Sequence, residues 1–157
     1  MKYLAVDPSY ANRAGWATYD TSTCEWEWGS YEVDGLNFKV RCWNLFNSLS
    51  RNQGKPDHLI LEWPTYYGGE RGQIAAAKSY TINLAGIVMF VVGAFAMPAK
   101  DYTLYTAPDW KGSVSKQVTA RRFFKMFKVE LNQVDHDTID AVMMLVYHLQ
   151  LIGELPK

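Results

Sequence analysis

Four carboxylates have the residue type and spacing that could bind metal ions: Asp7, Glu62, Asp137 and Asp140. Asp7 and Glu62 each end a short apolar run, and a proline follows each within two residues. Asp137 and Asp140 are three residues apart at the start of an apolar stretch, so a helix there would place both side chains on one face. Taken singly, each has an ordinary structural explanation, such as a helix cap, a turn or an ion pair at a strand end.

Brought to one point, these four carboxylates would need a cation. Burial and mutual repulsion raise the pKa values of clustered carboxyl groups unless a positive charge neutralises them. A ligand set made only of oxygen atoms suits Mg²⁺ or Mn²⁺ rather than zinc. Two such ions can activate a water molecule and stabilise both oxygens of an in-line phosphoryl displacement. The expected cofactor is therefore two Mg²⁺ ions, with Mn²⁺ able to substitute.

The charge pattern predicts a nucleic-acid partner for such a site. The whole chain has zero net charge, but residues 100–129 carry seven basic and two acidic side chains. Lys111 and Lys116 begin this basic segment and could contact phosphates beside the metal ions. Helical spacing groups three further DNA-binding candidates on one polar face: Arg121, Arg122 and Lys125. A solvated helix face is the ordinary alternative for such a charge run.

The elements that must position these residues follow from hydrophobic patterning. Strands are expected at residues 3–6, 15–19, 24–33, 58–62 and 102–106, and helices at 35–49, 73–95, 115–127 and 137–151. This order is typical of a mixed α/β layered domain, in which chemistry gathers at the carboxyl ends of strands. Asp7 and Glu62 both fall at strand ends, which supports a shared site.

Length and composition predict one domain, covering residues 1–157. Only two cysteines are present, Cys24 and Cys42, which favours reduced thiols and a cytoplasmic location. Asp7 comes too early for a secretory signal peptide. The longest apolar stretch, residues 84–99, has sixteen residues and falls short of the ~20 that span a bilayer. We therefore expect no membrane association.

Five short motifs carry a resemblance to a known family. They are Leu4-Ala5-Val6-Asp7-Pro8, Gly15-Trp16-Ala17, Leu59-Ile60-Leu61-Glu62, Ala107-Pro108-Asp109-Trp110-Lys111-Gly112 with Lys116, and Asp137-Thr138-Ile139-Asp140-Ala141. In this order and spacing, the chain resembles the RuvC-type Holliday-junction resolvases of the RNase H-like superfamily, especially the compact phage-type members. The resemblance implies an α/β fold with a mixed five-stranded sheet flanked by helices.

The resemblance also implies an activity and a set of site residues. Asp7, Glu62, Asp137 and Asp140 fall on the family's metal-binding acids, and Lys111 and Lys116 fall on its basic residues near the scissile phosphate. The implied enzyme is an Mg²⁺-dependent endodeoxyribonuclease that resolves four-way DNA junctions by paired nicks, leaving 5′-phosphate ends. A shift of one residue in register would make His136 a ligand in place of Asp137.

Two further features of the family fall on recognisable segments. Tyr66 and Tyr67 follow Glu62 where similar enzymes place an aromatic wedge, although packing against Trp16 or Trp63 would explain them equally well. The helix around residues 84–95 matches the dimer helix of similar enzymes, and one sheet face can cover only part of its apolar residues. We therefore expect a homodimer, with Val88 or Val91 facing outward.

Two other function classes are consistent with parts of the pattern. Sugar kinases and actin-like ATPases share a related core, but they need glycine-rich phosphate loops in two halves, and 157 residues hold only one half. A catalytically silent module that binds junctions as a scaffold would be expected to lose some of the acids. All four are present here, which favours the nuclease.

Overall fold

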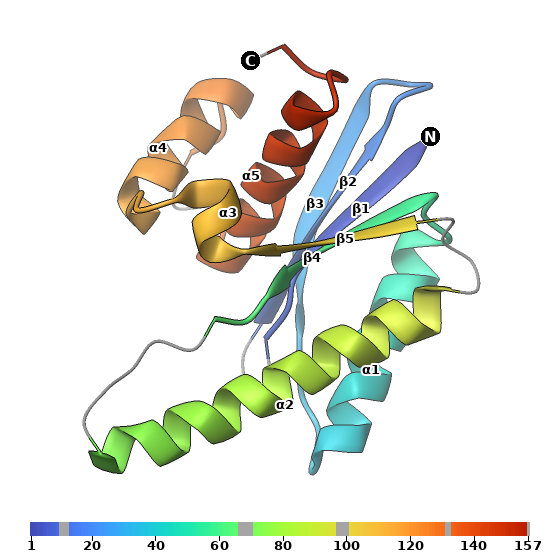
Figure 1. Cartoon of the computed structure of the whole chain (residues 1–157). Helices are drawn as coiled ribbons and strands as arrows, with labels where there is room; N and C mark the ends of the chain where they lie inside the picture. The colour runs from blue at the N-terminus through green and yellow to red at the C-terminus, as the bar shows by residue number, and fades with distance from the viewer. Residues whose placement is uncertain (10–12, 66–70, 97–100, 131–132, 157) are drawn as a thin grey trace.

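A computed structural model gives the fold and describes residues 1–9, 13–65, 71–96, 101–130 and 133–156 (Figure 1). Five strands form one sheet in the order β3-β2-β1-β4-β5. They are β1 (Lys2–Asp7), β2 (Arg13–Asp20), β3 (Glu25–Glu32), β4 (His58–Trp63) and β5 (Asp101–Thr106). Strands β1 to β3 form an antiparallel meander, whereas β4 and β5 run parallel to β1. The carboxyl ends of β1, β4 and β5 therefore meet at the same edge of the sheet.

Helices cover both faces of this sheet (Figure 1). They are α1 (Phe38–Gln53), α2 (Arg71–Ala96), α3 (Ala107–Lys111), α4 (Lys116–Phe127) and α5 (His136–Leu151). Helix α5 packs on β1, β2 and β3 with α4 beside it, and α1 and α2 cover the opposite face. The predicted five-stranded mixed sheet flanked by helices is confirmed. Within the described ranges, no helix has the length and apolar character needed to cross a bilayer.

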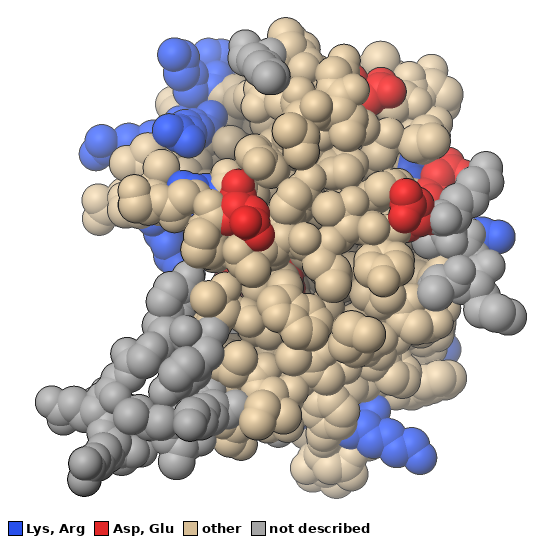
Figure 2. All heavy atoms as spheres, viewed as in Figure 1, with Lys and Arg blue, Asp and Glu red and all other residues tan. Residues whose placement is uncertain are grey.

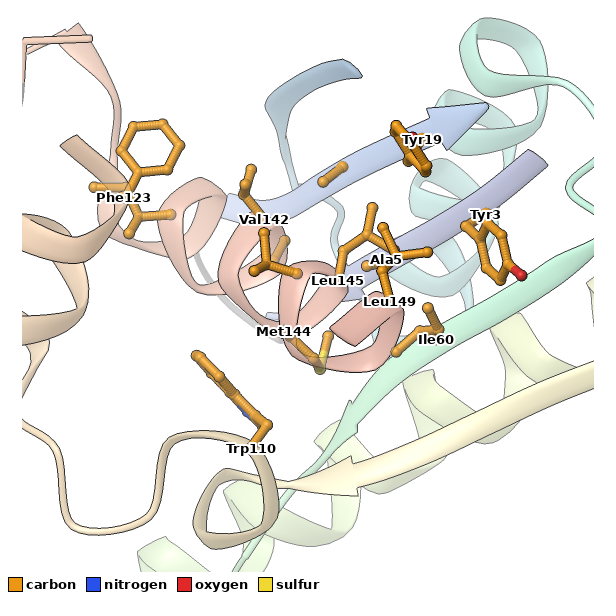
Figure 3. Close-up of a cluster of buried hydrophobic side chains, with 14 of the residues drawn as sticks. Tyr3, Ala5, Tyr19, Ile60, Trp110, Phe123, Val142, Met144, Leu145 and Leu149 are labelled. Atoms are coloured by element: carbon orange, nitrogen blue, oxygen red, sulfur yellow. The ribbon is translucent and has the colours of Figure 1, made fainter. Parts of the chain in front are cut away.

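The central strand β1 is buried on both faces, which explains its unbroken apolar run. Tyr3 and Ala5 belong to the hydrophobic cluster under α5, and Leu4 and Val6 belong to the cluster under α1 and α2. Figure 3 shows the first cluster, in which Leu145 of α5 lies over the strands. Successive side chains of a strand point to opposite faces of the sheet. The faces on which Ala5 and Val6 lie therefore also fix the face on which Asp7, the last residue of β1, lies.

Helix α2 differs from the expectation in what it leaves exposed. Val88 and Val91 are fully buried against the sheet of their own chain, so the prediction that one of them faces outward is wrong. The side chains on the outer side are Ile82, Met89 and Phe90, which are 70%, 53% and 37% exposed. The monomer therefore covers more of this helix than its composition alone indicates.

The short helix α3 was not expected, because its proline was interpreted only as the end of a strand. Pro108 lies in the first turn, where a missing backbone N–H costs nothing. Asp109 Oδ2 accepts hydrogen bonds from the backbone N–H and the hydroxyl of Thr106, at 2.7 and 2.6 Å. Five residues are too few to show a helical period, but they turn the chain back over the end of β5.

Candidate active site

Asp7 and Glu62 point to the same side of the sheet. Ala5 of β1 lies beside Ile60 of β4 in the parallel register, and both pack in the cluster under α5. Two residues further along each strand, the alternation returns to the same face. The two carboxylates therefore emerge side by side at the carboxyl edge of the sheet, facing the first turn of α5.

The start of α5 supplies two more acids. Asp135 caps the helix, with its side chain accepting a hydrogen bond of 2.9 Å from the backbone N–H of Thr138. Asp137 follows in the first turn and is partly buried, whereas Asp140 is one turn further in and only 4% exposed. Capping thus explains Asp135, but a cap does not account for the burial of Asp140.

Gly15 allows α5 to lie close enough for these acids to meet. Gly15 pairs with Asp7 across the β1–β2 ladder. A β-carbon at this position would collide with the backbone carbonyl of Asp137 and the backbone nitrogen of Thr138. Only a residue without a side chain lets the first turn of the helix rest on β2, so this glycine sets the distance between Asp137 and the sheet.

The four acids line one cleft of about 430 Å³, together with Lys111 and Lys116. Burial raises the pKa of Asp7 well above its usual value, and the charges of Glu62, Asp140 and Asp137 raise it further. Burial also raises the pKa of Glu62 and that of Asp137, although nearby lysines oppose this. The cleft therefore holds more negative charge than its own cations neutralise.

Lys111 places its ammonium group among these carboxylates. Its Nζ atom lies 2.9 Å from Asp140 Oδ2 and 4.0 Å from Glu62 Oε2. Burial lowers the pKa of Lys111, but the hydrogen bond and charge of Asp140, with help from Glu62, more than offset this and raise it overall. Trp110 also binds Glu62, because its Nε1 donates a hydrogen bond of 2.8 Å to Glu62 Oε2.

The donor set of the cleft fits a hard divalent cation. In the described part of the chain, no three His, Cys, Asp or Glu side chains already stand close enough together to hold an ion. The excess of negative charge around Asp7, together with a set of side-chain ligands that are all carboxylate oxygens, nevertheless matches the ligand preference of Mg²⁺ and Mn²⁺. Asp7, Glu62, Asp137 and Asp140 are the residues that would hold such ions, once the Lys111 ammonium gives up its contact with Asp140.

The remaining predicted residues divide into three groups. Lys116 begins α4 and lines the cleft, while His136 is exposed and does not line it. Arg121, Arg122 and Lys125 are exposed on α4, on the same side of the sheet as α5. Tyr66 and Tyr67 lie outside the described residues.

Sequence reasoning missed two residues that line the cleft and one that binds a carboxylate of the cleft. Trp110 precedes Lys111 in the same short motif, and this neighbourhood is the available signal for its hydrogen bond to Glu62. Tyr80 and Leu84 of α2 form the opposite wall. They belong to a helix interpreted only as an oligomer contact, and no spacing rule connects them to the acids.

Comparison with known proteins identifies the fold. No protein-family model matches the chain, and no curated protein matches it by sequence. Solved structures do match. The Thermus thermophilus RuvC, determined in complex with a Holliday junction substrate, has 13% identity and a TM-score of 0.63 over 98% of this chain and 96% of its own. The chain has the fold of the RuvC-type resolvases.

Two other resolvases share this RuvC-type fold. The yeast mitochondrial Holliday junction resolvase Ydc2 has 10% identity and a TM-score of 0.62, over 96% of this chain and 82% of its own. The Fowlpox virus resolvase, determined with its substrate Holliday junction DNA, has 16% identity and a TM-score of 0.55 over the whole of both chains. On this RuvC-type fold, the acidic cleft lies where the parallel strands end and α5 begins.

Proposed function

We propose that this protein is a metal-dependent, structure-selective endodeoxyribonuclease that resolves four-way DNA junctions by paired nicks, leaving 5′-phosphate ends. The observation that carries the proposal is the convergence of four carboxylates from β1, β4 and α5 on one cleft. The overall fold adds support, because the similar solved structures are Holliday junction resolvases and two of them were determined with junction DNA. When bound, two Mg²⁺ or Mn²⁺ ions would activate water and stabilise the leaving oxygen.

The chain's own residues would bind and orient the substrate strand. Lys116 lies at the start of α4, and its charge acts on both Glu62 and Asp137. From this position its ammonium group can meet the negative charge that develops on the reacting phosphate. Lys111, once released from Asp140, would hold the neighbouring backbone phosphate. Arg121, Arg122 and Lys125 would extend the contact along the strand.

A homodimer would give the two active sites that paired nicks require. The outer side of α2 exposes Ile82, Met89 and Phe90, which a soluble monomer would leave in water. The Phe46 ring contacts both Phe90 and Trp43 of α1, at centroid distances of 6.3 and 6.0 Å, so the apolar surface is continuous. A second copy of the chain would bury this surface by two-fold pairing.

The decisive experiment compares cleavage of a four-way junction, a fork, a flap and a linear duplex in Mg²⁺, in Mn²⁺ and in EDTA. The expected result is metal-dependent cleavage of the junction with symmetric nicks and little cleavage of the duplex. Asp140→Asn should abolish cleavage while keeping junction binding. Glu27→Gln, which changes an exposed acid on β3, serves as the control. Equal cleavage of all four substrates would contradict structure selectivity.

One observation favours a second candidate, a catalytically silent module that binds junctions as a scaffold. The Lys111 ammonium already pairs with Asp140, so the cleft is partly neutralised without metal. Such a module would bind the junction with the same affinity in Mg²⁺ and in EDTA and would never cut it. Cleavage by the purified chain that disappears in Asp140→Asn would exclude this candidate.

A further inference from the structure

A second cavity, of about 460 Å³, lies between α3, α4 and α5. Its apolar lining includes Met126 of α4, Met143 and Val146 of α5, and Trp110 of α3. Its volume falls in the range of about 300–1,000 Å³ that small-molecule sites occupy. The function proposed above uses Lys111, Arg122 and Lys125 of its lining as phosphate contacts but assigns no ligand to the cavity itself.

All charged side chains that line this cavity are cationic: Lys111, Arg122 and Lys125. Helix α4 contains no acidic residue, and in the described ranges neither Arg122 nor Lys125 forms a salt bridge. Figure 2 shows Lys and Arg atoms gathered at the upper left, where Figure 1 places α4. The ligand that complements this cavity is therefore anionic at its rim and apolar within.

The lining also suits a flat aromatic group. Methionine thioethers pack favourably against the edges and faces of rings, and Tyr147 and Trp110 add aromatic surface to the same cavity. Nucleobases stack on such surfaces with little regard to sequence. A single nucleotide combines both requirements, because it joins a flat apolar base to a phosphate.

The cavity shares a wall with the acidic cleft. Lys111 lines both spaces, and Trp110 lines the cavity while its Nε1 binds Glu62. A strand lying across α3 could therefore place one phosphate in the cleft and a nearby nucleotide in the cavity. In duplex DNA the bases are stacked and paired, so only an unpaired nucleotide could enter.

We propose that the cavity between α3, α4 and α5 binds one unpaired nucleotide of the substrate strand, with the base among the methionines and the phosphate on Arg122 and Lys125. This inference rests on the proposed nuclease function and adds a reason for the preference for branched DNA. Arg121 provides a matched comparison, since it has the same charge on the same helix but does not line the cavity.

The test uses the full-length Asp7→Asn protein in EDTA, labelled with ¹³C at the methionine methyl groups. Thymidine 5′-monophosphate and the pentanucleotide dT5 are the probes, and inorganic phosphate is the control. The expected result is that both nucleotides shift the methyl signals of Met126 and Met143 and leave that of Met89, on the opposite layer, unchanged. Phosphate alone should move neither cavity signal strongly.

Charge reversal then distinguishes a defined nucleotide site in the cavity from general attraction to the positive surface of α4. Arg122→Glu and Lys125→Glu should each weaken dT5 binding by at least about tenfold, the loss expected for one charged contact. Arg121→Glu should weaken it by only about twofold, through long-range charge alone. Equal losses in Arg121→Glu and Arg122→Glu would overturn the proposal.

Absence of any shift at Met126 and Met143 would also overturn the proposal, leaving this face to an acidic segment of a protein partner. Junction cleavage by the unmodified protein is measured in parallel. If that protein cuts junctions but dT5 does not bind the cavity, only the nucleotide site fails. If it cuts no branched DNA under any metal condition, the proposed function fails whatever the cavity binds.

Discussion

At the scale of single residues, the acidic cleft is a balance of charge that the protein alone does not complete. Asp7 is surrounded by three other carboxylates, and among the described residues Lys111 is the one cation hydrogen-bonded to any of the four, at Asp140. Sites that bind cations commonly hold such an excess, because the ion supplies the missing positive charge on binding. The fold is therefore expected to become more stable when the charge on Asp7 is removed or when metal binds.

The first prediction is that Asp7→Asn raises thermal stability in EDTA while abolishing cleavage. The pKa of Asp7 in the folded protein lies above its unfolded value of 3.8, so this carboxyl destabilises the fold increasingly as pH rises through that interval. At pH 7 we expect a melting temperature higher by roughly 2–8 °C, as about 1–2 kcal/mol gives in a domain of this size. Scanning calorimetry measures this shift.

The control for this prediction is a metal titration of both proteins. Mg²⁺ or Mn²⁺ should raise the melting temperature of the unmodified protein and have a smaller effect on Asp7→Asn. Glu27→Gln, on the exposed side of β3, should change neither value. A lower melting temperature for Asp7→Asn in EDTA would show that this carboxylate stabilises the metal-free fold.

The second prediction is that Gly15→Ala damages both the fold and the site. The added β-carbon would meet the backbone of Asp137, which cannot rotate away as a side chain could. Overpacking of this kind costs about 1–3 kcal/mol, and it would push the first turn of α5 away from Asp7. Urea unfolding and junction cleavage should both be impaired. Gly93→Ala, where the new β-carbon has no atom within 4 Å, should be neutral or slightly stabilising.

Part of this site could be predicted from residue patterns. The alternation of β1 and β4 is sufficient to place Asp7 and Glu62 on one face, and the i, i+3 spacing is sufficient to pair Asp137 with Asp140. The ion pair of Lys111 with Asp140 and the hydrogen bond of Trp110 to Glu62 were not predictable. Both depend on where α3 folds back, which is decided by tertiary contacts rather than by local sequence.

At the scale of elements, α5 is held on the sheet by more than apolar packing. His148 is buried on the side of α5 that faces the sheet, where its Nδ1 lies 3.0 Å from the Tyr105 hydroxyl of β5. The centroid of its ring lies 4.8 Å from the ring centroid of His58 on β4. Burial, with a smaller contribution from the nearby His58, lowers the pKa of His148 to about 4 against the opposing charge of Asp101. This contact is favourable only while His148 is neutral.

The third prediction follows from that pKa. The unfolded chain binds a proton near pH 6.5 and the folded protein only near pH 4, so stability is full above pH 6.5 and is lost as pH falls toward 4. The loss amounts to up to about 3 kcal/mol. Urea unfolding at several pH values measures the slope, which should be shallower in His148→Gln. His136→Gln, at an exposed histidine, should keep the slope of the unmodified protein.

The fourth prediction concerns α4. Since the whole chain has zero net charge, junction binding should depend on the local charge of this helix. Each phosphate contact contributes about 0.9 to the slope of log affinity against log salt. The triple variant Arg121→Ala, Arg122→Ala and Lys125→Ala should lower that slope by about 2–3. Fluorescence anisotropy with a labelled junction measures it, and an unchanged slope would place the DNA elsewhere.

At the scale of the whole molecule, the two helical layers differ in what they expose. The layer of α4 and α5 carries the cationic cluster Arg121, Arg122 and Lys125 on α4, and the layer of α1 and α2 carries exposed Trp43, Ile82, Met89 and Phe90. Burying large apolar side chains is worth roughly 1.5–3 kcal/mol each. The sequence predicted a partner surface on α2, but not which side of the helix it uses, because monomer packing decides which residues are left outside.

The fifth prediction is that the protein is a homodimer that Met89→Arg converts to monomers. Arginine at this exposed position would put a charge into the proposed interface without disturbing the monomer core. Sedimentation velocity at micromolar concentration should give a species of twice 18.0 kDa for the unmodified protein and of one chain for the variant. Val88→Arg is the contrasting variant, since its side chain is buried and the chain should unfold. A monomeric unmodified protein would contradict the assignment.

The sheet that separates the two hydrophobic clusters has a consequence for how such a sequence can change over generations. Leu4 and Val6 belong to one cluster, and Tyr3 and Ala5 belong to the other, so substitutions in α1 and in the part of α2 beyond Leu84 reach the acidic side only through the strands of the sheet. Selection can therefore act on the two exterior layers almost separately. A lineage could exchange its assembly partner or its preferred DNA while inheriting the same chemistry, and a handful of positions at the strand ends and at the start of α5 would be all that must persist.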